Sequence, residues 1–224
     1  MESVRSSAVA QMVRVVCWSA IGVLLLNFVS FLHAAESIES TRLMQPENLI
    51  FSDDFNTFNT NHWERVKGEW SVENGTLRGA EIPAQKHNGV IRAAVPPFKD
   101  CAIRFDLCFD GCSQVMFRIM DEKEYVVRIH ITTNSFVAYK DDHDHDGPDK
   151  AIMLAKAKVS FDLHQWKPVL IEIADGVMTT TIDGVTIKGT NDLFKVEKSK
   201  IGFRAYGSAF HIKNIKVWSA GSKP

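Results

Sequence analysis

The sequence has 224 residues, of which 45% are hydrophobic, and a formal net charge of −1. The missing basic footprint argues against nucleic acid as a partner, and the length fits one domain after an N-terminal segment is set aside. Cys17 falls in that segment, and the remaining Cys101, Cys108 and Cys112 allow at most one intrachain disulfide, which excludes a disulfide scaffold.

Residues 1–35 have the pattern of a secretory signal peptide. Arg5 and Arg14 precede an apolar run from Val15 to Leu32, and small residues follow it. The alternative is an uncleaved membrane anchor, because the run approaches the ~18 residues that a spanning helix needs. We expect a secreted or periplasmic protein that is not attached to a membrane after signal cleavage.

Residues 36–47 are expected to be a linker or a disordered N-terminus of the mature chain, and residues 48–219 a single β-rich domain. Within that domain, short segments of β-type alternation are separated by Asn-Gly and Asp-Gly dipeptides, which favour hairpin turns. So many short strands predict an all-β, two-sheet antiparallel sandwich. The expected strands are 48–52, 62–66, 69–73, 76–80, 89–95, 101–109, 113–120, 124–132, 135–141, 152–161, 166–174, 177–182, 185–188, 200–206 and 209–218.

The strands between 101 and 132 place their odd-numbered apolar residues on one core face. Directly opposed residues of an antiparallel pair point to the same side, so this register needs turns of odd length. Residues 109–111 would serve as the first such turn and would place Cys108 opposite Cys112. That pairing is compatible with a disulfide in an exported protein, or with two buried thiols.

The other side of the same sheet is expected to be polar. A two-residue turn at 133–134 puts Arg128 and Tyr139 on one side, and Asp141 continues that side. Arginine and tyrosine commonly bind sugars and carboxylates, so a binding surface is one interpretation. A solvated sheet face is the alternative. The full set is Arg104, Asp106, Arg118, Arg128, His130, Tyr139 and Asp141.

Residues 140–150 form an acidic loop in which residues 142–147 read D-H-D-H-D-G. This is the first half of a calcium loop, in which alternate carboxylates converge on a hard cation. Met153 stands at the twelfth position where an EF-hand needs Glu, so an EF-hand is excluded. A divalent metal, calcium or manganese, held by Asp142, Asp144 and Asp146, is one interpretation. A solvated hairpin tip paired with Lys140 and Lys150 is the other.

A second polar connection contains Lys86 and His87. A histidine can act as a general base near neutral pH, and a lysine can stabilise a developing oxyanion. A plain polar loop is the alternative. The E-x-D-x-x-E strand of laminarinase-like enzymes is absent, which argues against retaining hydrolysis by two glutamates.

Several segments together resemble the concanavalin A-like lectin/glucanase superfamily, and within it the 3-keto-disaccharide hydrolase domain family. The resemblance covers about residues 48–218. It is carried by Phe51–Phe55, Trp70–Gly79, Ile171–Val185, Ile201–Phe203 and Ile212–Val217.

The resemblance implies a jelly roll that binds carbohydrate and cleaves 3-keto-glycosides. In that chemistry a base removes the C2 proton, the C1 group leaves and water adds to the enone. His87 or His143 would be the base, and a metal on the acidic loop would stabilise the enolate. Lys86, Arg118, Arg128, Tyr139 and Asp141 would contact the sugar. A non-catalytic carbohydrate-binding module and a structural domain with a metal-stiffened loop remain alternatives.

Overall fold

The structure is a computed structural model that describes residues 43–220, so the expected signal peptide lies outside the described residues. This part of the chain is a 13-stranded antiparallel sheet with two short 3-10 helices, Pro83–Gln85 and Asp192–Lys195. No helix within residues 43–220 is long and apolar enough to cross a membrane. The strands are β1 Pro46–Asp53, β2 Trp63–Lys67, β3 Glu69–Glu73, β4 Thr76–Ala80, β5 Gly89–Phe98, β6 Cys101–Met120, β7 Tyr125–Thr132, β8 Ser135–Lys140, β9 Ile152–Lys158, β10 Trp166–Ala174, β11 Val177–Ile182, β12 Val185–Thr190 and β13 Lys198–Ala220.

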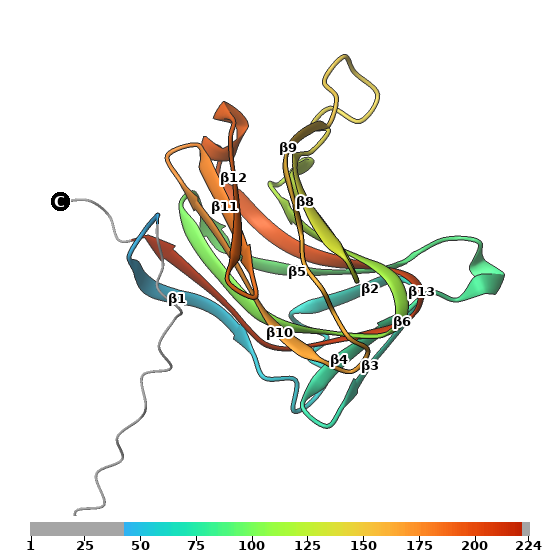
Figure 1. Cartoon of the computed structure of the whole chain (residues 1–224). Helices are drawn as coiled ribbons and strands as arrows, with labels where there is room; N and C mark the ends of the chain where they lie inside the picture. Colours follow the sequence, from blue (N-terminus) through green and yellow to red (C-terminus); the bar gives the residue numbers. More distant parts are fainter. Residues whose placement is uncertain (1–42, 221–224) are drawn as a thin grey trace, which may run out of the picture. The chain divides into compact units, whose positions relative to one another are not determined.

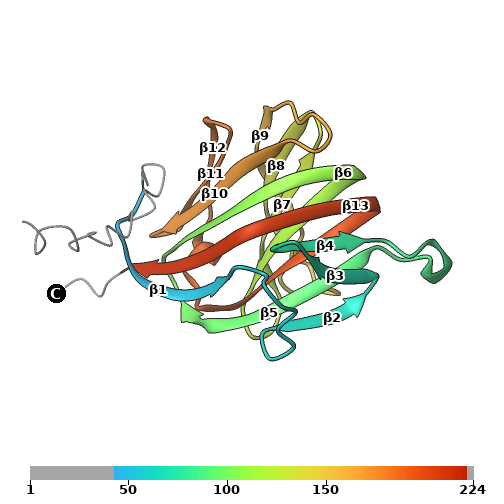
Figure 2. The same cartoon turned by 90° about the horizontal axis from the view of Figure 1, so that it is seen from below.

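The sheet folds over on itself into two layers, and the long strands β6 and β13 run through both (Figures 1 and 2). One layer has the order β2-β5-β13-β6-β7-β8-β9, using the first half of β13 and the second half of β6. The other has the order β12-β11-β10-β6-β13-β4-β3, with β1 also paired to β13. The expected all-β, two-layer antiparallel sandwich is therefore confirmed.

The fold in the sheet is visible in ring contacts within one strand. Phe105 and Phe117 both belong to β6, and twelve residues of straight strand would separate them by about 40 Å. Their ring centroids are nevertheless 5.2 Å apart. Gly111 (φ 82°) and Gly207 (φ 89°) adopt left-handed backbone conformations where the two strands bend, and the ladder between them shifts register there. Glycine is favoured at such positions because it has no Cβ to clash.

This bend corrects two expectations. Residues 109–111 do not form a hairpin turn, because β6 continues through them and its partner β13 bends alongside it. Cys108 therefore lies on the same strand as Cys112, opposite His211 and Trp166, and cannot be its cross-strand partner. The cysteines of the described chain, Cys101 among them, are free and buried, as the thiol alternative expected.

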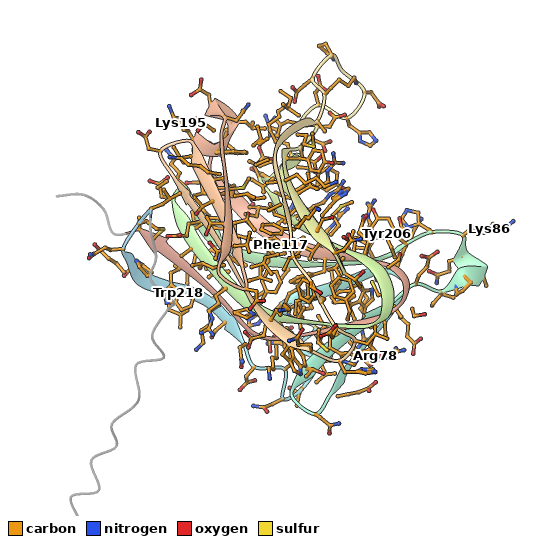
Figure 3. All side chains as sticks on the ribbon, in the orientation of Figure 1. Arg78, Lys86, Phe117, Lys195, Tyr206 and Trp218 are labelled. Carbon is orange, nitrogen blue, oxygen red and sulfur yellow. The ribbon has the colours of Figure 1, made fainter. Side chains whose placement is uncertain are left out.

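The space between the layers is filled by the predicted alternating apolar residues. Phe117 lies in the middle of the molecule (Figure 3) and is fully buried, as are Phe105 and Ile129. Burial of aromatic and branched side chains is the main contribution to the stability of such a sandwich. The outward side chains of each layer do not contribute to this core and can take part in binding.

The register predicted for the middle strands is confirmed. Arg128 lies opposite Tyr139, and His130 lies opposite Val137. The grouping of Arg104 and Asp106 with these residues is wrong, since the first half of β6 belongs to the other layer. The two outer surfaces of the sandwich thus carry different charged groups.

Candidate functional site

The outer side of the β7–β8 layer carries a cluster that we call the arginine face. It comes from the second half of β6, the first half of β13, and β7 and β8, and Asp141 follows β8 directly. Each member sits outward because its neighbours in the strand point into the core. The arginine face comprises Arg118, Arg128, Arg204, Tyr125, His130, Tyr139 and Asp141.

Asp141 is the centre of this face. Its side chain is only 1% exposed, and it lies 3.2 Å from Nε of Arg118 and 3.4 Å from a terminal nitrogen of Arg128. The Asp141 backbone N–H donates to the carbonyl of Val126 at 3.0 Å, which fixes the start of the acidic loop against β7. The predicted sugar-contacting residues Arg118, Arg128 and Asp141 are therefore brought together by one buried carboxylate.

Two tyrosines hold the guanidinium groups in place. The Arg118 guanidinium lies 3.8 Å from the ring centroid of Tyr125, and that of Arg128 lies 4.6 Å from Tyr139. Such cation–π contacts orient the planar guanidinium and reduce the freedom it would lose on binding a ligand. Tyr139 thus joins the cluster as predicted, whereas the role of Tyr125 was not anticipated.

Arg204 was not predicted to belong to the site, because β13 is distant in the chain and its pairing with β6 was not predicted. In the structure Arg204 is paired with Met116, next to Gly202, which is paired with Arg118. Arg118 and Arg204 border one small crevice together with Arg92. The outward spacing of Arg204 between the core residues Phe203 and Ala205 was the available signal.

His130 is an electrostatically unusual member of the face. Burial lowers its pKa from 6.5 to about 4, and the positive charges of Arg128, Arg118 and Arg204 act in the same direction. Its Nε2 is buried and has no hydrogen-bond partner among the described residues. His130 is therefore neutral near pH 7 and adds no charge to the arginines.

The acidic loop, drawn beyond the ends of β8 and β9 in Figure 1, is held largely by its own carboxylates. One oxygen of Asp142 accepts from the backbone N–H groups of Asp144 and His145 at 3.3 and 3.0 Å. Asp144 accepts from the N–H of Asp149 at 2.9 Å, and Asp149 forms an ion pair with Lys140. That hydrogen bond from Lys140 is the main cause holding the pKa of Asp149 below its usual value.

The predicted metal ligands do not converge in this conformation. Asp142 and Asp144 are turned toward backbone amides of the loop, and residues 43–220 contain no group of three His, Cys, Asp or Glu side chains placed to hold a metal ion. A divalent ion would need several oxygens directed at one point. The loop as it stands does not fit a metal ion. Metal binding by Asp142, Asp144 and Asp146 stays a prediction, and it would require the loop to rearrange so that these carboxylates converge.

His143 anchors the loop to the turn between β6 and β7. Its Nε2 lies 2.6 Å from the Oδ2 of Asp121. An ionised carboxylate only accepts hydrogen bonds, so Nε2 is the donor, and in the neutral imidazole Nδ1 then carries the lone pair. Burial alone would raise the pKa of Asp121, but hydrogen bonds from the backbone of Glu124 and from His143 lower it below its usual value.

A pocket of about 260 Å³ is lined by Asp121 of this pair, although not by His143, and it adjoins the arginine face. Tyr125 belongs to both, since it lines the pocket and stacks on Arg118. The pocket is also lined by Asp121 and by His145 of the acidic loop. Size and polarity suit a small polar ligand such as a sugar ring.

Lys86 and His87 are not brought to this site. They follow the 3-10 helix Pro83–Gln85 in an arm that projects from the body of the molecule, and Lys86 points outward at its tip (Figure 3). The ring of His87 contacts the carbonyl of Asn88 at 2.8 Å. No contact among residues 43–220 joins either side chain to Asp121, Asp141 or the arginines.

Taken together, the geometry offers a histidine bound to a carboxylate that lines a pocket, and a set of oriented cationic donors on the adjoining face. The imidazole of His143 is held by Asp121, as general bases commonly are. The guanidinium groups of Arg118 and Arg128 are fork-shaped donors for oxygen atoms. Such a site can remove a proton and stabilise the oxyanion that results.

Comparison with known proteins assigns most of the chain to a recognised domain family. Residues 51–218 match the model of the 3-keto-alpha-glucoside-1,2-lyase-like domain family. A comparison with curated proteins gave no match.

Solved structures with the same fold include carbohydrate-binding and carbohydrate-cleaving proteins. The carbohydrate-binding module CBM66 from Bacillus subtilis is 14% identical with a TM-score of 0.56, covering 70% of this chain and 96% of that module. A non-specific endo-beta-1,3(4)-glucanase of family GH16 is 12% identical with a TM-score of 0.59, covering 80% and 95%. The endo-beta-1,3-glucanase from Pyrococcus furiosus is 11% identical with a TM-score of 0.58, covering 79% and 95%. These similarities confirm the concanavalin A-like jelly roll.

Proposed function

The chain belongs to the family of 3-keto-alpha-glucoside-1,2-lyase-like domains, and on that premise we propose that it cleaves 3-keto-glycosides at the arginine face. The observation that carries the proposal is the joining of Arg118 and Arg128 through buried Asp141, beside a pocket lined by Asp121, whose carboxylate binds His143. We further propose that the protein is exported, because residues 1–35 have the signal-peptide pattern.

The chemistry starts from a glycoside whose C3 carries a ketone, which makes the C2 proton acidic. Nδ1 of His143 takes that proton, and the electron pair forms an enolate with its negative charge on the C3 oxygen. Collapse of the enolate forms the C1–C2 double bond as the C1–O bond breaks, and the leaving oxygen takes a proton. Water then adds to the enone if the overall result is hydrolysis.

The residues of the site have separate roles in this scheme. Asp121 positions the imidazole and favours its protonated form after the transfer. Arg128 and Arg118 stabilise the enolate oxygen, an interaction that strengthens as charge develops. Tyr139 and Asp141 are positioning residues that fix the guanidinium planes.

The test is release of p-nitrophenol from p-nitrophenyl 3-keto-α-glucoside. We expect wild-type protein to release it and His143→Ala to be slower by about 10²-fold or more, the usual contribution of a general base. The matched control is His87→Ala, the other predicted base, which should keep wild-type activity. Full activity in His143→Ala with loss in His87→Ala would reverse the assignment, and no release by wild type would refute the catalytic proposal.

A non-catalytic carbohydrate-binding module is the second candidate. It is favoured by the presence of only one predicted base at the site within the described residues, since His87 lies on the projecting arm. Binding of the 3-keto-glucoside without exchange of its C2 proton in deuterated water would identify this function. Exchange of the C2 proton without release of the C1 group would instead show that the base acts and that the chain fails to cleave the C1–O bond.

A further inference from the structure

The arginine face holds more positive charge than its own carboxylate neutralises. Arg118 and Arg128 are directly opposite each other on β6 and β7, where two like charges are normally destabilising. They share the single carboxylate of Asp141. Arg204 forms no ion pair with any residue of the described chain, and its Nε is buried without a hydrogen-bond partner.

Within residues 43–220, no carboxylate other than Asp141 forms an ion pair with these three arginines. His130, on the same strand as Arg128, is neutral near pH 7 for the reasons given above. The pKa of Arg118 is lowered by burial, and although Asp141 acts to raise it, Arg204 and Arg128 act to lower it further. Three guanidinium groups and one carboxylate therefore leave an excess of about two positive charges on a partly buried surface.

The floor between these groups is defined by Met116. Its strand neighbours Val115 and Phe117 point into the core, so Met116 lies on the outer side. It is paired with Arg204 on one flank and with His130 on the other, and the surrounding side chains leave it 3% exposed. Arg118 and Arg128 form the next row along the same strands. Met116 is thus an apolar spot with Arg204 on one flank and with Arg118 and Arg128 in the adjoining row.

A partly buried cluster of like charges is expensive to maintain unless an anion completes it. Guanidinium groups recognise carboxylate and sulfate oxygens through paired hydrogen bonds, and the stacked tyrosines already restrict two of the three. A neutral sugar would satisfy hydrogen-bond donors but would leave the excess charge in place. The chemistry of the cluster therefore selects for a negatively charged substituent.

We propose that the glycan bound at the arginine face carries an oxyanion substituent, a carboxylate or a sulfate ester, seated over Met116 between Arg204 and Arg128. The proposal rests on the proposed function in placing a sugar on this face, but it concerns equilibrium binding and not cleavage. It identifies Arg204 as a specificity-determining residue.

Titration calorimetry at low salt, on the full mature chain, tests the proposal with three probes. These are trigalacturonate for the carboxylate, a sulfated carrageenan disaccharide for the sulfate ester, and neutral cellotriose. We expect at least one anionic probe to bind ten-fold or more tightly than cellotriose, and its binding to weaken as salt is added. The preferred anionic probe assigns the substituent. Equal or tighter binding of cellotriose, or no binding of any probe, would overturn the proposal.

Arg204→Gln and Arg78→Gln form a matched pair of variants. Both remove one positive charge, but Arg78 lies on β4 and pairs with Glu69 at 3.5 Å, away from the arginine face. We expect Arg204→Gln to weaken binding of the anionic probe about ten-fold, as for loss of a charge-assisted hydrogen bond. Arg78→Gln should bind as wild type does.

Equal losses in the two variants would mean that only net charge matters, and would contradict a built site. Arg204→Lys keeps the charge without the fork, and we expect it to recover part of the affinity if its unfolding temperature matches wild type. Release of p-nitrophenol separates the two proposals: anionic binding without any turnover refutes catalysis alone, whereas turnover without anionic preference refutes only this inference.

Discussion

The two halves of β6 present two outer surfaces that differ in how their charges are balanced. On the first half, Arg104 lies 4.0 Å from Asp106, and Asp106 also accepts a hydrogen bond from Asn214 at 2.7 Å. Lys213 lies over the ring of Trp166 at 4.3 Å. On the second half, Arg118 and Arg128 share one buried carboxylate, and Arg204 has no carboxylate partner within residues 43–220.

Alternation along a strand therefore identifies which residues point outward, but it does not identify which of them form a binding site. Both surfaces have the same period, come from the same strand and carry arginine and aromatic side chains. They differ in that Arg104 has a carboxylate partner of its own on the first surface, whereas on the arginine face two arginines share the single carboxylate of Asp141. Unbalanced, partly buried charge is the feature that indicates a ligand.

The largest difference between the surfaces is expected on removing their carboxylates. Asp141→Asn leaves two partly buried guanidinium groups without their shared partner, so we expect the free energy of unfolding to fall by about 3–5 kcal/mol. Asp106→Asn removes a more replaceable contact and should cost about 1 kcal/mol. Urea denaturation measures both. Equal losses would mean that Asp141 is no more central than Asp106.

The pH dependence of stability should depend on His130. Its pKa is near 6.5 when unfolded and about 4 in the fold, so the unfolded chain binds the extra proton between these values. The free energy of unfolding should therefore fall as the pH is lowered from 6.5 to 4, with the full contribution present above 6.5. His130→Gln should flatten this part of the profile in urea denaturation. An unchanged slope in the variant would assign the effect to other groups.

The bend that separates the two surfaces can be weakened at Gly207. A Cβ there would meet nothing nearer than the backbone nitrogen of Ser113 at 3.9 Å, so the cost of Gly207→Ala comes from its φ of 89°. We expect a loss of about 1–2 kcal/mol in the free energy of unfolding. The adjacent substitution Ser208→Ala should be nearly neutral. If the two variants unfold alike, the bend does not need a left-handed residue.

The smallest effect is expected on the projecting arm. Lys86→Ala should leave both sugar binding and unfolding within about 0.5 kcal/mol of wild type, as for other exposed surface positions. Calorimetry with the anionic probe and thermal unfolding are the measurements. A ten-fold loss of affinity would show that Lys86 contacts the ligand, which would require the arm to close over the arginine face.

The sequence predicted the fold class and most strands because hydrophobic alternation and Asn-Gly or Asp-Gly turns are local signals. Strands 69–73, 76–80, 166–174 and 177–182 have the predicted bounds. The turn at 109–111 was mistaken because Asp-Gly also occurs at a bend in a continuous strand. Local sequence does not distinguish the two when the partner strand, β13, bends far along the chain.

The site was predicted only in part, because only some of its residues are placed by local signals. Arg128, Tyr139 and Asp141 were placed together because their strands are joined by a short turn of known parity. Arg204 was missed because it comes from β13, whose position beside β6 depends on the whole topology. Lys86 and His87 were included on residue type alone, which gives no information about where an arm points.

Hydrogen exchange of the His143→Ala variant with methyl 3-keto-α-glucoside tests the central claim most directly, because it reports where the sugar lies without turnover. Our account predicts that added sugar protects amides in the second half of β6, in β7 and β8 and around Asp121 and Asp141. Protection confined to the surface of Arg104 and Trp166, or to residues 81–88, would contradict it.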